Sequence, residues 1–191
     1  MGISDQGLQL LKKYDPGAGS DVLEFGCQNF YDSENYGVSA APILQEMFGW
    51  KILSADLIGC YEFPVVDLRE RQELGEFDLV TNFGCFCCVE GRRGFWQSYE
   101  NAHRACRVGG LMIHKTPKIG ATRWSNEPMH HFVTKEFYRN LAERMNYEIL
   151  EIGEHNSHGD PHGRHVFICL KKLTDNEFMS FFEFDQLDFC S

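Results

Sequence analysis

Strand-like and helix-like segments alternate along this chain, and no other feature of the sequence restricts the fold as strongly. Short apolar runs predict strands, and the amphipathic runs between them predict helices. Strands that alternate with helices form a mostly parallel sheet with helices on both faces. We therefore expect an α/β fold of this kind. The expected strands lie at 21–25, 51–56, 65–67, 77–82 and 111–114, and the expected helices lie at 3–14, 39–48, 95–107 and from Thr134 onward.

The last third of the chain has a different pattern. Two long extended runs, 147–153 and 165–171, flank a loop rich in glycine, aspartate, proline and histidine, which predicts an antiparallel hairpin. An acidic, phenylalanine-rich tail follows at 173–191. Its aromatic residues are too closely spaced for a free tail, so we expect it to pack on the domain body or on a second subunit, as in a homodimer. The alternative is a peptide that binds another partner. We therefore expect a single domain at 1–172, which includes the helix at 3–14, and then the tail.

The overall composition limits the partners of the chain. Its 18 basic and 28 acidic residues give a net charge of −10, which argues against generic nucleic-acid binding and against a polybasic membrane anchor. No apolar run approaches the length of a transmembrane helix, and the N-terminal residues do not resemble a secretory signal. Eight scattered cysteines in such a chain are expected to be reduced thiols. These features predict a cytoplasmic protein with no membrane partner.

Polar residues and glycines follow the expected strands, where a parallel α/β sheet binds its ligands. Glu24 and Gly26 lie at the end of the first strand, Asp56 at the second, Asp67 at the third and residues 82–84 at the fourth. Gly26 permits a tight turn, and the Asp56 carboxylate can accept both hydroxyls of a ribose. An acidic residue near a strand end is more often a solvated loop residue or a helix cap. Because these residues occur together and in this order, they favour a common site.

At these positions the chain resembles the class I S-adenosylmethionine-dependent methyltransferases, in particular small, stand-alone bacterial or phage-type members. The resemblance implies a Rossmann-like, seven-stranded, mostly parallel sheet that ends in an antiparallel hairpin. It also implies a methyltransferase that uses S-adenosylmethionine as its cofactor and a small molecule as its substrate. The matching stretches lie at 22–26, 53–57, 66–68, 77–84 and 108–114.

The resemblance also implies the cofactor contacts at the strand ends. Glu24 and Gly26 would hold the methionine end, Asp56 the ribose and Asp67 the adenine amino group. Residues 82–84 would face the transferred methyl group. The full set of expected cofactor-binding residues is Glu24, Gly26, Cys27, Asp56, Leu57, Asp67, Leu68, Asn82, Phe83 and Gly84.

Two departures from the family pattern favour a second interpretation. Gln28 and Phe30 replace the second and third glycines of the usual Gly-x-Gly-x-Gly loop, and Cys87-Cys88 stands where relatives carry Glu-His. A loop without these glycines cannot approach a ligand as closely. The alternative function is therefore a methyltransferase fold that has lost catalysis and serves as a binding or scaffold protein.

Three histidines are candidate catalytic bases. A base is needed only where the methyl acceptor carries a proton, and the ordinary pKa of histidine lies near working pH. His114 ends the fifth strand, and His130 and His131 follow in the next loop. The alternative is that His114 caps a strand and that the other two are ordinary loop residues.

Two further clusters of potential metal ligands have structural explanations. The loop 155–165 contains four histidines and one aspartate, a composition that can bind a transition metal. Its spacing matches no zinc motif, however, and Gly-Asp-Pro is ordinary turn chemistry. Cys85, Cys87 and Cys88 follow the fourth strand, where we expect buried thiols that fill space. We therefore assign no metal ligands.

Overall fold

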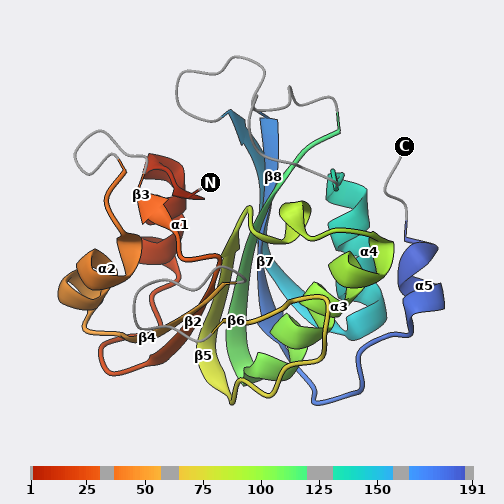
Figure 1. The fold of residues 1–191 in the computed structure, drawn as a ribbon, viewed down its shortest axis with the longest axis horizontal. Coiled ribbons are helices and arrows are strands. Elements are labelled where there is room, and N and C mark those ends of the chain that lie inside the picture. Colours follow the sequence, from red (N-terminus) through yellow and green to blue (C-terminus); the bar gives the residue numbers. More distant parts are fainter. Residues whose placement is uncertain (1, 31–36, 57–64, 120–130, 157–163, 188–191) are drawn as a thin grey trace.

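The computed structural model of the chain describes residues 2–30, 37–56, 65–119, 131–156 and 164–187. A mixed sheet runs through the centre of the molecule (Figure 1). Four of its strands form parallel pairs, and the last two form an antiparallel hairpin, one strand of which also pairs antiparallel with the parallel group. The predicted parallel core and C-terminal hairpin are therefore confirmed. Within the described residues the sheet has six strands, in the spatial order β4 (Lys51–Ala55), β2 (Asp21–Phe25), β5 (Phe77–Phe83), β6 (Cys106–Pro117), β8 (Arg164–Lys172) and β7 (Tyr147–Asn156).

The short strand expected at 65–67 is reduced to a single parallel bridge between Asp56 and Val65 in the part of the chain that the structure describes. In this bridge the Val66 amide donates to the Asp56 carbonyl at 2.9 Å. The Asp67 carboxylate then accepts the backbone amide of Arg69 at 3.0 Å and starts a turn. Within the described residues 65–67 the chain forms this one bridge, because the turn at Asp67 begins directly after it.

Helices cover both faces of the sheet, as expected (Figure 1). On one face lie α1 (Asp5–Lys13) and α2 (Ala40–Phe48), and on the other lie α3 (Arg92–Ala105), α4 (Lys135–Met145) and α5 (Phe181–Asp185). A two-stranded sheet of β1 (Gly2–Ile3) and β3 (Asn29–Phe30) ties the N-terminal residues to the loop after β2. Each face of the main sheet has its own apolar core, with Leu11, Trp50 and Leu79 on the α1 side and Phe95, Tyr99 and Phe137 on the α3 side.

Local signals determine several helix ends. Gly49, with a left-handed φ of 71°, ends α2, and the Thr134 hydroxyl accepts the Phe137 amide at 3.0 Å where α4 begins. The end of α3 differs from the expectation. This helix stops at Ala105 because Cys106 already pairs with Phe77 on β5. Tertiary pairing thus extends β6 backwards, beyond the strand expected at 111–114.

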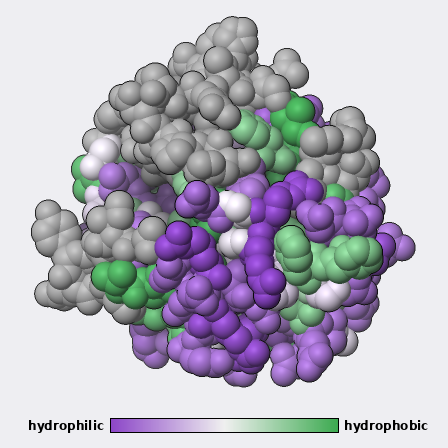
Figure 2. All heavy atoms as spheres, turned by 45° about the vertical axis from the view of Figure 1, so that its right-hand side comes forward, coloured by the Kyte–Doolittle hydropathy of each residue, from purple (hydrophilic) through white to green (hydrophobic). Residues whose placement is uncertain are grey.

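The acidic tail packs on the domain body. Ser180 and Glu183 form a capping box at the start of α5, and Phe184 is buried in the core of the α3 side. The Trp96 indole donates to the Met179 carbonyl at 2.9 Å. Figure 2 turns this side of the molecule forward and shows a mainly hydrophilic surface with small hydrophobic groups. Packing of the tail on the body is therefore confirmed for its described part, and a homodimer stays a prediction.

Two features concern membranes and metals. Within the described residues, no helix combines the length and the apolar character that crossing a membrane requires. In this part of the chain, no three His, Cys, Asp or Glu side chains come together in a way that could hold a metal ion. Most of the histidine-rich loop, 157–163, lies outside the described residues, as do the predicted site residues Leu57 and His130.

Candidate functional site

The carboxyl ends of β2, β4 and β5 meet at one edge of the sheet. Phe25 at the end of β2 is in register with Ala55 on β4 and with Asn82 on β5. Gly26 and Asp56, which directly follow Phe25 and Ala55, therefore leave the sheet at the same height along the strands. The structure thus brings most of the predicted site residues to this edge, which we call the carboxyl edge.

Glu24 is a buried carboxyl group beside the carboxyl edge. It is 3% exposed, and its Oε2 accepts the Ser54 hydroxyl at 2.6 Å from the paired position on β4. Its Oε1 is buried and has no hydrogen-bond partner among the described residues. Burial raises the pKa of Glu24 to about 7, against the lowering effects of the Ser54 hydroxyl and the Gln28 backbone amide, and the nearby Asp56 carboxylate adds to the rise. A cationic ligand group at this place would stabilise the charged carboxylate.

The turn after β2 requires glycine. Gly26 has a φ of 98°, and a Cβ at this residue would lie 2.7 Å from the Cys85 Cβ. Its amide donates to the Ala55 carbonyl at 2.8 Å, which holds the turn against β4. The half-buried Cys27 also has a positive φ, 37°. Residue 26 must therefore lack a side chain, because Cys85 and Gln28 pack directly against its backbone.

Gln28 and Phe30, which replace two glycines of the family loop, have structural roles. The Gln28 Nε2 donates to the Phe25 carbonyl at 2.8 Å, and its side chain lies against Gly26. Its Oε1 is buried without a partner in the described part of the chain. Phe30 is fully buried in the core of the α1 side. The Gln28 side chain thus fills space that a glycine would leave open.

The acidic residues after β4 differ in their surroundings. Asp56 is half-buried at the end of the strand. Arg69 donates to both carboxylate oxygens of Asp67, from Nη2 at 2.7 Å and from Nε at 3.0 Å, and these hydrogen bonds lower the pKa of Asp67. Leu68 is buried in the core of the α3 side. An adenine amino group at Asp67 would therefore share the carboxylate with Arg69.

Asn82 shapes the turn after β5. It is fully buried, and its Oδ1 accepts the amides of Cys85 and Phe86 at 2.8 and 3.1 Å. Phe83 is also buried, on the α1 side, whereas Gly84 follows with a φ of 95°. Three residues were predicted to face a methyl group. Of these, Gly84 places its backbone at the carboxyl edge, whereas Asn82 and Phe83 position the turn.

Three cysteines line the same turn. The Cys87 Sγ donates to the Gly84 carbonyl at 2.9 Å and lies 3.9 Å from the Cys88 Sγ. Burial raises the pKa of Cys85, and the charge of Asp56 raises it further. A protonated thiol at Cys85 packs as a small side chain, as the sequence predicted for this cluster.

Comparisons with known proteins relate this arrangement to a fold. The sequence matches no protein-family model and none of the curated proteins. A solved S-adenosylmethionine-dependent methyltransferase from Methanosarcina mazei has a TM-score of 0.63 at 13% identity, over 87% of this chain and 98% of that one. The chain has the class I methyltransferase fold.

Two further methyltransferases of this fold were solved with S-adenosylhomocysteine. The N-methyltransferase NodS from Bradyrhizobium japonicum WM9 has a TM-score of 0.63 at 12% identity, over 88% of this chain and 86% of that one. The 1,6-didemethyltoxoflavin-N1-methyltransferase from Burkholderia thailandensis has a TM-score of 0.60 at 14% identity, over 82% of this chain and 72% of that one. Because the identities are below 25%, these likenesses show the fold alone.

The methyltransferase fold buries two of the predicted bases. His114 is 1% exposed, its ring centroid lies 5.1 Å from that of Tyr99, and burial lowers its pKa to about 3. His131 is stacked on Phe95 at 4.3 Å between centroids, and its Nε2 lies 2.9 Å from the Val89 carbonyl oxygen. Both histidines pack in the aromatic core, so the function proposed below does not use them as bases.

Lys115 was not predicted as a site residue. It follows His114 on β6 and faces the α1 side, because side chains alternate along a strand. It is 6% exposed, and its Nζ donates to the Gly2 carbonyl at 3.4 Å. Burial lowers the pKa of Lys115 to about 8. The alternation of side chains between the two faces of a strand was the sequence signal that could have placed Lys115 and His114 on opposite sides of the sheet.

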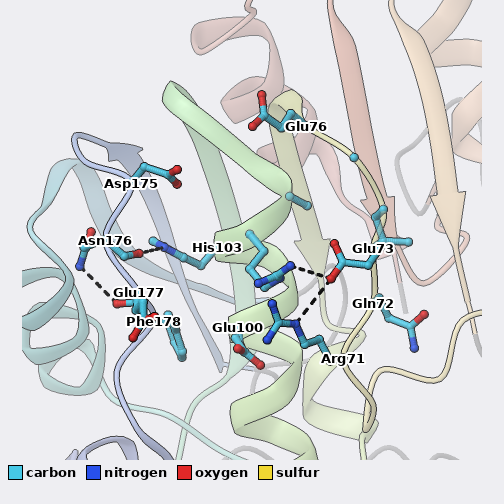
Figure 3. A pocket seen from close by; sticks show the side chains of 14 residues that line it. Arg71, Gln72, Glu73, Glu76, Glu100, His103, Asp175, Asn176, Glu177 and Phe178 are labelled. Atoms are coloured by element: carbon cyan, nitrogen blue, oxygen red, sulfur yellow. Dashed lines mark hydrogen bonds and ion pairs between the residues drawn. The ribbon is translucent and has the colours of Figure 1, made fainter.

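A hollow of about 540 Å³ lies elsewhere, against the C-terminal half of α3 (Figure 3). Its walls also include residues 71–76 before β5 and 175–178 of the tail. Arg104 pairs with Glu73 at 2.7 Å, and Arg71 pairs with the same carboxylate at 3.5 Å. The hollow adjoins the amino ends of β5 and β6, so it is separate from the carboxyl edge of the methyltransferase fold.

Proposed function

We propose that this chain is a cytoplasmic S-adenosylmethionine-dependent methyltransferase that acts on a small molecule. The observation that carries the proposal is Glu24, a buried carboxyl group with one unpaired oxygen beside the turn at Gly26. Such a group is costly in an apolar interior unless a cation or a donor meets it. S-Adenosylmethionine carries an ammonium group and a sulfonium group. Two methyltransferases of the same fold, NodS and the didemethyltoxoflavin methyltransferase, were solved with its demethylated product.

The residues of the carboxyl edge fit this cofactor. Glu24 would receive the ammonium of the methionine portion, and Asp56 would accept the ribose hydroxyls. Gly26 and Gly84 would allow the backbone to approach, while Asp67 would share its carboxylate between Arg69 and the adenine amino group. When bound, the cofactor supplies an electrophilic methyl group. The chain would align that group with the acceptor and exclude water.

The chain has few described residues beyond its core elements, which favours a small substrate. The described residues are almost entirely taken up by the sheet, its covering helices and the packed tail. The net charge of −10 opposes a polyanionic substrate. The B. thailandensis protein of this fold is named for a small-molecule substrate. A small acceptor, with or without help from a second chain, is therefore the substrate class we propose.

Cofactor titration of an Asp56→Ala variant tests this function. The wild-type protein is expected to bind S-adenosylmethionine and S-adenosylhomocysteine in calorimetric titrations. Asp56→Ala should weaken both by at least tenfold, because hydrogen bonds to a charged group contribute about 1.5–3 kcal/mol. The matched control is Asp185→Ala on α5, which removes a carboxylate that pairs with Arg92 at 3.0 Å.

Two results would contradict these assignments. Absence of cofactor binding to the wild-type protein at millimolar concentration would remove the enzyme proposal. Equal affinities of wild type and Asp56→Ala would leave the ribose without its proposed partner.

Gln28 favours the second candidate function, a methyltransferase fold that serves as a silent binding or scaffold protein. Its side chain occupies the loop where the family pattern has glycine, and its Nε2 is bonded to the Phe25 carbonyl. A cofactor that needs this space must first displace the side chain and break that hydrogen bond. A chain under no demand to bind the cofactor would tolerate such a residue.

Gln28→Ala is expected to tighten S-adenosylhomocysteine binding by about three- to tenfold, since breaking one hydrogen bond costs about 1 kcal/mol. Isothermal titration of the variant against wild type measures the change. Gln186→Ala, an exposed position after α5, is the control and should leave the affinity unchanged. If Gln28→Ala binds no more tightly than wild type, the side chain does not obstruct the site, and the silent interpretation loses its support.

A further inference from the structure

Lys115 is a buried cation with few partners. Its Nζ makes one hydrogen bond to the described residues, a long contact of 3.4 Å to the Gly2 carbonyl. No carboxylate among these residues lies within ion-pair distance of it. An ammonium group has three N–H donors, so two of them have no acceptor among the described residues. Such an arrangement is costly for a side chain that is 6% exposed.

Other lysines of the chain show how the fold normally satisfies this group. Lys172 is also buried, and it donates to two carbonyls and to the Asp175 carboxylate. Lys118, three residues after Lys115, pairs with Glu154 at 2.8 Å. Burial lowers the pKa of Lys115 to about 8, so most of this side chain is still charged at pH 7. Lys115 is therefore a cation for which the described protein supplies no anion.

Lys115 lies at the carboxyl edge, two strands away from Glu24. It is in register with Phe83, directly before Gly84. It shares its sheet face with Glu24, because Glu24 is in register with Thr81, two residues before Phe83. Two strands and two residues separate the backbones of Glu24 and Lys115, which corresponds to roughly 12 Å. The cofactor end of the carboxyl edge is thus acidic, and its far end carries a lysine.

We infer that Lys115 binds an oxyanion of the methyl acceptor, which makes the substrate an acidic small molecule. This inference rests on the proposed function and names its substrate class. A carboxylate or phosphoryl oxygen would accept the N–H groups that the Gly2 carbonyl leaves unused, in a charge-assisted hydrogen bond. Binding at Lys115 would hold the acceptor beside the turn at residues 82–84.

The groups around Lys115 allow its protonation to be distinguished from that of other residues in a pH series. Phe83 on β5 and Phe167 on β8 flank it in register, and β1 contacts it through Gly2. By pH 8 the ordinary titration of histidine is nearly complete, so the loss of the Lys115 proton should dominate anion binding from there upward. Cys87 acts on Lys115 electrostatically, and the other ionisable side chains near this end of the sheet are His165 on β8, Lys118 after β6 and Glu154 on β7.

The test titrates the full-length protein, saturated with S-adenosylhomocysteine, with benzoate and separately with inorganic phosphate at constant ionic strength. At pH 7 we expect binding of at least one anion. Benzoate alone would indicate a carboxylic acceptor, and phosphate alone a phosphorylated one. Lys115→Met should weaken binding at least tenfold, whereas Lys115→Arg and the matched control Lys118→Met should stay within threefold of wild type. Between pH 7 and pH 9, the affinity of wild type for benzoate, where benzoate binds, should fall about tenfold as Lys115 loses its proton.

The outcomes separate this inference from the proposed function. Failure of S-adenosylhomocysteine to bind, seen before any anion is added, contradicts the proposed function. With the cofactor product bound, an absence of anion binding to wild type overturns the inference, and so do equal anion affinities of wild type and Lys115→Met. If Lys115→Met does not fold, the Lys115→Arg variant and the pH series on wild type decide. A benzoate affinity that does not change from pH 7 to pH 9 overturns the inference.

Discussion

Replacing Glu24 with glutamine is expected to raise the free energy of unfolding by about 3 kcal/mol at pH 8 and to weaken cofactor binding at least tenfold. Burial raises the pKa of Glu24 from 4.5 to about 7, a rise worth about 3 kcal/mol at 1.36 kcal/mol per pKa unit. Between these two pKa values the folded chain binds more protons than the unfolded chain. The stability of the wild-type protein therefore falls as pH rises from 4.5 to 7 and stays lower above pH 7. A neutral amide avoids this cost but cannot pair with a cationic ligand.

Urea unfolding at pH 4.5 and pH 8 measures the first part of this prediction, and calorimetric titration with S-adenosylmethionine at pH 8 measures the second. At pH 4.5 the variant and wild type should differ by less than about 1 kcal/mol, because the carboxyl group is mostly protonated in the folded chain. Glu46→Gln, an exposed position on α2, is the matched control. A stability gain of the same size at both pH values would show that packing, rather than charge, causes it.

Strong local signals made much of the fold predictable. The strand expected at 21–25 has those bounds in the structure, and Gly49 ends the helix expected at 39–48. Apolar runs and caps encode such elements within a few residues of themselves. The region at 65–67 and the start of β6 depend instead on distant partners. Val65 retains one bridge to Asp56, and Cys106 joins β6 because it pairs with Phe77. No local pattern contains that information.

The candidate site was predictable to the level of strand ends, but not to the level of side chains. Parallel topology brings the carboxyl ends of β2, β4 and β5 together, so the proximity of Glu24, Gly26 and Asp56 follows from the strand order. What covers each end depends on elements far away in sequence. Aromatic rings from α3 and α4 enclose His114, while Lys115 faces the opposite side. Because side chains alternate along a strand, His114 and Lys115 are predicted to face opposite sides of the sheet. Only the tertiary packing determines which of the two is buried among aromatic rings.

Lys172→Met is expected to lower the free energy of unfolding by about 3 kcal/mol. The Lys172 Nζ is buried at the end of α3, where it donates to the His103 and Cys106 carbonyls at 3.0 and 2.9 Å and to the Asp175 carboxylate at 2.9 Å. Methionine keeps the length of the side chain but leaves the two buried carbonyls without their donor, at about 1–3 kcal/mol each. Asp175 adds little to the loss, because its side chain is 79% exposed and can be solvated.

Urea unfolding at pH 7 measures this loss, with Lys171→Met as the matched control. Lys171 is half-buried and faces the opposite side of β8, so its replacement should change stability by less than about 1 kcal/mol. A second measurement reports on the charge itself. Burial, with a further contribution from the Lys172 charge, lowers the pKa of His103 to about 4, so an NMR titration of His103 should give a higher pKa in Lys172→Met. If the stability falls while the His103 pKa stays the same, the lysine acts through packing alone. If neither changes, the ammonium group does not hold the end of α3, and the contacts of the tail with α3 must do so.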